Sequence, residues 1–514
     1  MTKTTSNNKR IAKNTLLLYF RMTLTMIVSL YTSRVVLEAL GIEDYGIYNA
    51  VGTFVAMFNM LSGSLSSAIS RFITFELGKE KQERLKNIFS SAVTIQIILA
   101  LIILLLAETI GLWFLNNKMV IPDDRIIAAN WVYQFSIIAF GFNLISIPYN
   151  AAIIAHERMS AFAYIGIIEV TGKLLTAISL TVCPIDRLVF YGFSLTLIAL
   201  IIRLIYGYYC KKHFTECSFQ PTFDKSLLKE MFNFAGWNFI GASSAVLRDQ
   251  GGNIIINLFC GPAVNAARAI AIQVSSTIQG FVSNFMTALN PQITKSFAAG
   301  NHKYMMTLIF QGARLSFYIL LLLSLPIILN AHSILHLWLG GIVPEHTTLF
   351  VQLVLIFAMS EALANPLITA MLATGQIRNY QLVVGGLQLM NLPVSYILLR
   401  TGYPPECVFI TAIIISVCCE MARLYMLHSM IKLPVRQFLR NVYFNVIGVF
   451  LIAAIVPYLV INNIEKDLIN LILTSILCIT CSIISILYIG CNKEERKLIA
   501  EKLRILQLKI KKQR

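Results

Sequence analysis

Two uninterrupted apolar stretches decide the fold class: IQIILALIILLL at residues 95–106 and VFYGFSLTLIALII at residues 189–202. Neither alternates polar and apolar residues as a half-buried strand does, and each lies in a segment that can supply the roughly 20 residues of a membrane-spanning helix. Only 13% of the 514 residues are charged and 57% are hydrophobic, whereas a soluble protein carries roughly 25% charged residues. The composition therefore excludes a soluble multidomain enzyme and predicts an all-α, multi-pass membrane protein.

Charge clusters and turn residues divide the apolar sequence into about fourteen expected transmembrane helices. These lie near residues 12–37, 46–75, 88–115, 126–154, 160–182, 188–210, 231–258, 263–294, 304–330, 347–373, 379–399, 406–430, 438–461 and 468–490. The first and eighth are polar enough for a hydropathy window alone to miss them. With the N-terminus inside, 28 of the 42 Lys and Arg residues lie in cytoplasmic segments and 5 in outer segments. This asymmetry predicts that both termini are cytoplasmic, and it explains the net charge of +17 without nucleic acid.

Two groups of six spans resemble each other, which predicts an internal duplication. Residues 68–74 (AISRFIT) align with residues 288–294 (ALNPQIT) at an offset of 220, and Ile88-Phe89 aligns with Ile309-Phe310 at 221. At an offset of 218, the matching residues are Pro148, Ala152, Ala155 and Phe162 with Pro366, Ala370, Ala373 and Tyr380. An even number of spans returns the chain to the side of the membrane where it began, so both copies have the same orientation. We therefore expect two lobes related by a pseudo-twofold axis along the membrane normal, with a cleft between them.

The expected organisation has four parts. They are an N-terminal lobe at 1–215 (helices 1–6), a C-terminal lobe at 216–432 (helices 7–12), helices 13 and 14 at 433–492, and a basic amphipathic cytoplasmic tail at 493–514. The tail alternates charged and apolar residues at helical spacing, which is typical of a segment lying along an anionic membrane surface.

Nine basic residues fall inside the expected spans, where each costs at least about 2.5 kcal/mol at a helix centre. They are Arg21, Arg34, Arg71, Lys173, Arg203, Arg248, Arg268, Arg314 and Arg423. Glu169 lies four residues before Lys173, and Glu420 three before Arg423, so each pair can form on one helix. Arg203 lies near a span end, where it can snorkel to the interface. Arg248 is harder to explain, because Asp249 beside it points about 100° away on an ideal helix.

Five of these arginines cluster in the first two helices of each copy, as a central site between the copies would require. They are Arg21, Arg34, Arg71, Arg248 and Arg268. Guanidinium groups bind phosphate oxygens bidentately, so this cluster predicts a cationic cavity for an anionic substrate, with Arg21, Arg71 and Arg248 on a diphosphate. Scattered interface anchors are the alternative. The intramembrane acids Asp249 and Glu361 are the candidates for a coupling ion.

Two motifs resemble the polysaccharide flippases of the multidrug/oligosaccharidyl-lipid/polysaccharide exporter (MOP) superfamily. The first is residues 33–41 (SRVVLEALG) with residues 44–49 (DYGIYN), and the second is residues 252–262 followed by Asn265-Ala266-Ala267-Arg268. The resemblance covers roughly residues 10–490. It implies flipping of undecaprenyl-diphosphate-linked oligosaccharide repeat units, of the O-antigen type, across the bacterial plasma membrane by alternating access. It carries over no cation site, so coupling to sodium, to protons or to neither stays open.

The resemblance also implies the partners: a lipid-linked anionic oligosaccharide, the lipid bilayer and, as a candidate, a polysaccharide polymerase. A multidrug or other small-molecule exporter of the same fold is the alternative, although the excess of intramembrane bases over acids favours an anionic cargo. An enzyme is not expected, because His156, His332, His336 and His346 have no nucleophile in a recognisable arrangement. No cofactor or metal is expected either, since the close pair Cys478 and Cys481 lacks histidine or acidic neighbours.

Overall fold

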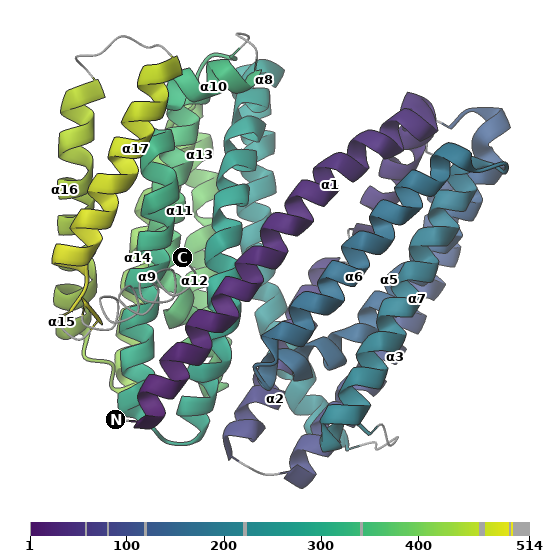
Figure 1. Cartoon of the computed structure of the whole chain (residues 1–514), viewed down its shortest axis with the longest axis horizontal. Coiled ribbons are helices and arrows are strands. Elements are labelled where there is room, and N and C mark those ends of the chain that lie inside the picture. The colour runs from purple at the N-terminus through teal and green to yellow at the C-terminus, as the bar shows by residue number, and fades with distance from the viewer. Residues whose placement is uncertain are drawn as a thin grey trace, which may run out of the picture. The chain divides into compact units, whose positions relative to one another are not determined.

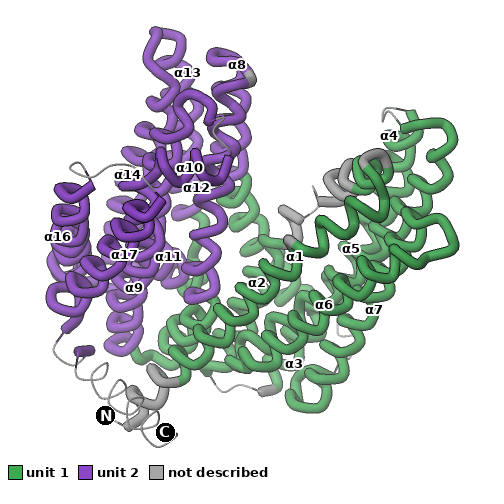
Figure 2. The backbone as a smooth tube through the Cα atoms, turned by 45° about the horizontal axis from the view of Figure 1, so that its top comes forward, with its two compact units in different colours: residues 1–243, 287–301, 372–378 green, residues 244–286, 302–371, 379–514 purple. Residues whose placement is uncertain are grey.

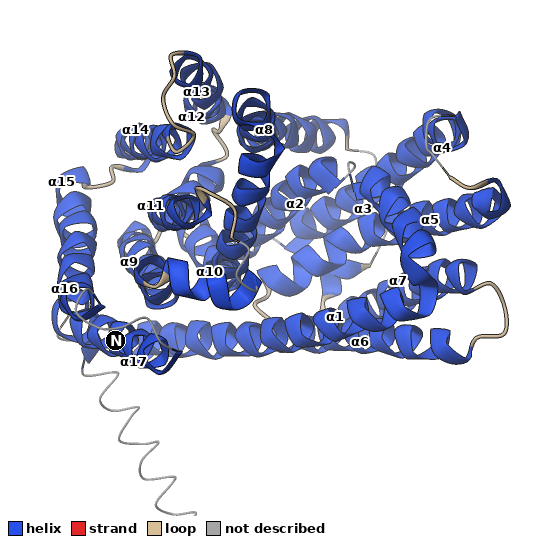
Figure 3. Cartoon of the chain, turned by 90° about the horizontal axis from the view of Figure 1, so that it is seen from above, coloured by secondary structure: helices blue, strands red, loops and turns tan. Residues whose placement is uncertain are grey.

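The computed structural model describes residues 2–56, 59–79, 82–117, 121–218, 224–339, 343–461, 468–492 and 495–496. All regular structure in these ranges is helical, and no strand occurs among them (Figure 3). The predicted all-α fold is confirmed. The expected amphipathic tail at 493–514 lies outside the described residues except for Glu495 and Arg496.

The helices follow one another along the chain with short connections (Figure 1). In the first half they are α1 (Thr2–Ala56), α2 (Asn59–Lys79), α3 (Gln82–Leu106), α4 (Leu112–Asn117), α5 (Ile126–Ala155), α6 (Met159–Ser179) and α7 (Arg187–His213). They continue with α8 (Lys225–Ala298), α9 (His302–Leu329), α10 (Ala331–Leu339), α11 (Thr347–Thr374), α12 (Arg378–Leu389), α13 (Asn391–Arg400) and α14 (Cys407–Ile431). The last are α15 (Val435–Phe438), α16 (Phe444–Ile461) and α17 (Leu468–Ser485).

Eleven helical segments of the described chain are long and apolar enough to cross a membrane. The first expected span is among them, as Arg10–Gly41, although its mean hydropathy is the lowest of the eleven, as its polar residues predicted. The eighth is not among them, and neither are α2 and the rest of α8, although all of these residues are helical. The chain is therefore a multi-pass membrane protein, and fourteen stays an approximate count.

Two glycines break helices that otherwise run on without a loop. Gly41 in α1 and Gly261 in α8 have positive φ angles of 79° and 82° with extended ψ angles. This conformation is accessible to glycine and strained for other residues. The two positions stand 220 apart, the offset of the predicted duplication. The expected boundaries between spans 1 and 2 and between spans 7 and 8 are thus glycine kinks rather than loops.

The chain forms two compact units (Figure 2). Unit 1 comprises Met1–Ser243, Thr287–Asn301 and Leu372–Arg378, and unit 2 comprises Ser244–Met286, His302–Met371 and Asn379–Arg514. Within unit 1, α1 packs against α6 and α5 against α7 (Figure 1). Unit 1 therefore contains two short segments from the second half of the sequence. The expected lobe boundaries at 215/216 and 432/433 stay a prediction.

The turn between α5 and α6 centres on Glu157, whose backbone is left-handed (φ 59°). Its carboxylate is only 2% exposed and binds Arg10 Nε and Lys295 Nζ, each at 2.9 Å. Gln292 Nε2 donates to the same carboxylate, and Asn14 Nδ2 donates to the Glu157 carbonyl at 3.3 Å. Because Gln292 and Lys295 come from the second half of the sequence, this turn joins the two halves within unit 1.

The equivalent turn of the second half, 218 positions later, contains Gly375 with φ 78°. Arg71 of α2 donates from Nη2 to the Ala373 carbonyl at 3.2 Å, an acceptor in the last turn of α11 that has no helical partner. Its guanidinium also lies over three aromatic rings, those of Phe72, Phe75 and Phe234. Gln292 and Lys295 stand 220 positions after Phe72 and Phe75. Each half of the sequence thus supplies the side chains that hold the other half's turn.

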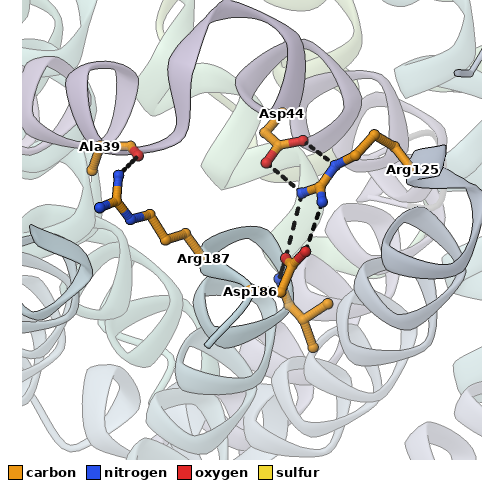
Figure 4. A network of polar contacts seen from close by, with 6 residues as sticks. Ala39, Asp44, Arg125, Asp186 and Arg187 are labelled. Carbon is orange, nitrogen blue, oxygen red and sulfur yellow. Dashed lines mark hydrogen bonds and ion pairs between the residues drawn. The ribbon is translucent and has the colours of Figure 1, made fainter. Parts of the chain in front are cut away.

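A second set of contacts ties the helix ends of the first half together. Arg125, just before α5, binds Asp44 of α1 bidentately and Asp186 at 2.7 Å (Figure 4). Asp186 caps α7 by accepting from Val189 N. Burial alone would raise the pKa of Asp186, but its bonds to Arg125 and to backbone N–H groups lower that pKa overall. The stretch of residues 44–49, which carried the family resemblance, thus has a structural role at Asp44.

The second half repeats this contact with different chemistry. His346 Nδ1 lies 2.6 Å from Glu406 Oε1. Glu406 stands 220 positions after Asp186, and His346 stands 221 after Arg125. The kinks, turns and ion pairs therefore recur at the offsets found in the sequence, in agreement with the predicted duplication.

Replacing Gly375 by alanine tests the contact between Arg71 and the second turn. An alanine Cβ would lie 2.5 Å from Arg71 Nη2, in addition to the left-handed strain of about 1 to 2 kcal/mol. The control is Gly402→Ala, because Gly402 also has a positive φ (89°) but no atom within 4 Å of the added Cβ. We expect a larger loss of thermal midpoint in detergent for Gly375→Ala than for Gly402→Ala. Equal losses of thermal midpoint in the two variants would show that Arg71 does not contact this turn closely.

Candidate functional site

Whether an arginine has a carboxylate partner decides how much positive charge it leaves for a ligand. In a low-dielectric membrane span an unpaired ion is costly, so an arginine without an acid partner is a candidate for anion binding. Two of the five predicted site arginines, Arg34 and Arg248, have a carboxylate partner. The other three have none in the described chain.

Arg34 and Arg248 are neutralised by neighbours on their own helices. Arg34 Nε binds Glu38 Oε1 at 2.9 Å, and both side chains are largely exposed. Arg248 Nε binds Asp249 Oδ1 at 3.0 Å, and its guanidinium lies over the Phe357 ring. Their divergent directions on the helix did not predict this pair, which forms because the long arginine side chain curls back to its neighbour.

Arg21 has no carboxylate partner and no hydrogen bond in the part of the chain that the structure describes. Its guanidinium lies 4.2 Å from the centre of the Phe162 ring, from which it gains a cation–π contact. Its side chain runs over Gly166 of α6, where an added Cβ would lie 3.0 Å from Arg21 Cδ. The glycine thus leaves room for the arginine, and the guanidinium donors stay available.

Arg268 bonds only to neutral acceptors. Its Nη2 donates to the Asp249 carbonyl at 2.7 Å, and Nη1 lies 3.5 Å from Asn253 Oδ1. Its Nε is buried and has no hydrogen-bond partner among the described residues. Arg268 therefore keeps its full positive charge inside unit 2.

Arg71 also lacks a carboxylate partner, but its contacts are already described: the Ala373 carbonyl and three aromatic rings. Its position in the turn contact explains its conformation without a ligand.

Of the four remaining intramembrane basic residues, three have a carboxylate partner, and Arg203 has none in the described chain. Lys173 binds Glu169 at 2.6 Å and Arg423 binds Glu420 at 3.3 Å, so both predicted helix pairs are confirmed. Arg314 is only 6% exposed and binds Glu495 at 2.7 Å, a partner that the sequence separation concealed. Arg203 lies over the Tyr149 ring at 4.0 Å.

Unit 2 contains two carboxylates near one arginine: Glu420 and Arg423 are buried, and Glu361 is partly buried. Glu420 and Arg423 side chains are 3% and 1% exposed, and Glu420 Oε1 has no hydrogen-bond partner in the described chain. Glu361 Oε1 accepts from Ser416 Oγ at 2.6 Å, one helical turn before Glu420. When both carboxylates are ionised, this group has one more acid than base.

Unit 1 contains a cavity of about 360 Å³ that the sequence did not reveal. Its lining includes the neutralised pair Glu169 and Lys173 and uncharged polar groups from Ser136, Asn143 and Thr196. The sequence signal for this cavity is the presence of polar residues inside the apolar spans of α5 and α7. The pattern of a single helix does not show that these residues come together in space. The described residues contain no cluster of three or more His, Cys, Asp or Glu suited to hold a metal.

Comparison with known proteins gives the family and the fold. Residues 11–297, more than half of the chain, match the family described as polysaccharide biosynthesis protein. An outward-facing multidrug resistance MATE family transporter of the MOP superfamily superposes with a TM-score of 0.71 at 14% identity, covering 83% of this chain and 96% of that one. A MATE in its bent conformation gives 0.71 at 13% identity, with 84% and 97% covered.

A further similar structure is a MOP superfamily transporter from Pyrococcus furiosus, with a TM-score of 0.65 at 13% identity, covering 83% of this chain and 96% of that one. Reverse polarity of its binding pocket suggests a different function for that protein. Comparison with curated proteins finds no match. The chain belongs to the polysaccharide biosynthesis protein family and has the fold of the MATE transporters of the MOP superfamily.

Proposed function

We propose that this protein flips an undecaprenyl-diphosphate-linked oligosaccharide from the inner to the outer leaflet of a bacterial plasma membrane by alternating access. Both termini would be cytoplasmic, as the 28-to-5 distribution of Lys and Arg favours. A polysaccharide polymerase would then take up the flipped repeat units. Membership of the polysaccharide biosynthesis family supports the substrate class, and the MATE fold supports transport.

The observation that carries the proposal is the uncompensated charge of Arg21 in the first half and Arg268 in the second. A diphosphate offers several anionic oxygens, and a guanidinium fork can bind two of them at once. Arg21 has no hydrogen-bond acceptor in the described chain, and Arg268 has only neutral ones. We therefore propose that each of these two arginines binds phosphate oxygens of the cargo. Arg34, Arg71 and Arg248, which the sequence also suggested, have other partners.

A multidrug exporter is the second candidate, since the similar solved structures include a multidrug resistance transporter. Cationic drugs need free carboxylates. Asp249 and Glu169 are instead paired with Arg248 and Lys173. These two carboxylates are therefore not free for a cationic drug, and the other intramembrane pair, Glu361 and Glu420, is assigned below to the coupling ion.

We propose further that Glu361, together with Glu420, holds the coupling ion. With both carboxylates ionised, Arg423 would compensate only one of them, and a proton or a small cation would neutralise the other. Asp249, the other candidate from the sequence, is 57% exposed and already paired with Arg248, so it has less need of an ion.

The cargo assignment predicts the behaviour of Arg21→Gln and Arg268→Gln in cells. Each loses a charge-assisted contact of about 1.5 to 3 kcal/mol, so both should insert normally, lose glycan export and accumulate lipid-linked precursor on the inner leaflet. Arg203→Gln is the matched control, because Arg203 is another intramembrane arginine packed on an aromatic ring without an ion pair. Equal loss in all three variants, with reduced protein level, would assign these arginines to folding.

The coupling assignment predicts that Glu361→Gln removes the response of transport to a proton or sodium gradient while the protein still binds its cargo. Asp249→Asn should retain that response. Transport by purified protein in liposomes, with each gradient imposed in turn, makes the measurement. A Glu361→Gln variant that is still accelerated by either gradient would contradict the assignment.

A further inference from the structure

A basic cavity of about 670 Å³ lies in unit 2 where α14 ends and the next span begins. Its lining includes His428, Arg436, Gln437, Arg440 and Asn441, and none of its lining residues is acidic. The surrounding sequence is equally one-sided, since no Asp or Glu occurs from residue 421 to residue 464. This cavity is separate from the cargo arginines and plays no part in the proposed function.

The two arginines of this cavity are unlike those inside the spans. Arg436 and Arg440 are exposed, stand four residues apart and have neither an ion pair nor a hydrogen bond in the described chain. His428 Nδ1 lies 2.9 Å from the Leu433 carbonyl, which leaves its Nε2 free to face the cavity. Gln437 and Asn441 add neutral donors. The cavity therefore combines two guanidinium forks with amide donors and no competing carboxylate.

Its position relative to the membrane is given by the spans on either side. The span Cys407–Ile431 ends and the span Val435–Ile461 begins within a few residues of each other, so the cavity lies at the membrane boundary. Six residues before the end of the first span and nine residues into the second, Tyr425 and Phe444 are 78% and 73% exposed. They lie close to His428 and Arg440 along their helices. Exposed aromatic side chains at this depth are typical of the lipid interface.

From this arrangement we propose that the cavity binds the phosphate headgroup of an anionic membrane lipid, with its acyl chains along Tyr425 and Phe444. Basic pockets between transmembrane helices are suited to lipid phosphates, and two arginine forks match the oxygens of one phosphodiester. A lipid phosphate at this point would bridge α14 and the chain that leads into α16.

Native mass spectrometry of the purified full-length protein tests this assignment. The probes are phosphatidylglycerol, zwitterionic phosphatidylethanolamine, polyprenyl diphosphate and inorganic phosphate. We expect phosphatidylglycerol to be retained in preference to phosphatidylethanolamine. Each lost guanidinium contact should weaken its binding by at least about tenfold, so R436Q with R440Q should abolish the preference.

The control variant is K211Q with K212Q, which removes two exposed positive charges from the end of α7 and should bind phosphatidylglycerol as the wild type does. An unchanged thermal midpoint checks that the arginine variant is folded; if it is not, the single variants R436Q and R440Q make the same comparison. Equal retention of both phospholipids, or equal loss in both double variants, would overturn the proposal. Binding of polyprenyl diphosphate alone would assign the cavity to the cargo, and full competition by inorganic phosphate would make it a free-phosphate site. Either result would also overturn the lipid assignment.

Discussion

The low dielectric of the membrane is the constraint on which this structure depends, because an ionised side chain inside a span needs a partner. Most of the intramembrane bases have one in the same helix, as Lys173 has Glu169, or at a distant chain end, as Arg314 has Glu495. The exceptions are informative for that reason. Arg71 and Arg203 also lack a carboxylate, but Arg71 holds the turn at Ala373 and Arg203 lies on the Tyr149 ring near a span end. Arg21 and Arg268 have no such explanation, so we propose that a ligand supplies their anion.

The second organising feature is the reciprocal contact between the two halves of the sequence. Glu157 and Gly375 occupy equivalent left-handed turns. Lys295 of α8, from the second half, holds the first turn, and Arg71 of α2, from the first half, holds the second. The chemistry of the two turns differs. The first turn binds basic side chains through the buried Glu157 carboxylate, and the second binds Arg71 through the Ala373 carbonyl. A movement that separates the halves at these turns would have to release both contacts together.

Local patterns in the sequence predicted the features that depend on one helix. The uninterrupted apolar runs predicted the all-α fold, and spacing of three or four residues predicted the pairs at Lys173 and Arg423. The two glycine kinks recur at the repeat offset found in the sequence, although the sequence did not indicate that Gly41 would join two spans without a loop. A glycine with positive φ and extended ψ allows this direct junction, and hydropathy carries no signal for it.

The remaining site features depend on tertiary contacts or on side-chain reach, which spacing does not describe. Glu495 lies 181 positions after Arg314, and Arg248 reaches its neighbour Asp249 despite their divergent directions on a helix. The grouping of Glu361 with Glu420 joins α11 to α14 in the same way. The sequence therefore identifies the charged residues inside the spans, but it does not show which of them form ion pairs.

The most direct test of the central claim compares the binding of polyprenyl diphosphate and uncharged polyprenol to the purified protein. If Arg21 and Arg268 bind the phosphates of the cargo, polyprenyl diphosphate should bind more tightly than polyprenol by at least about tenfold for each guanidinium contact. That preference should disappear when both arginines are replaced by glutamine. Equal affinity for the two lipids in the wild-type protein would contradict the account.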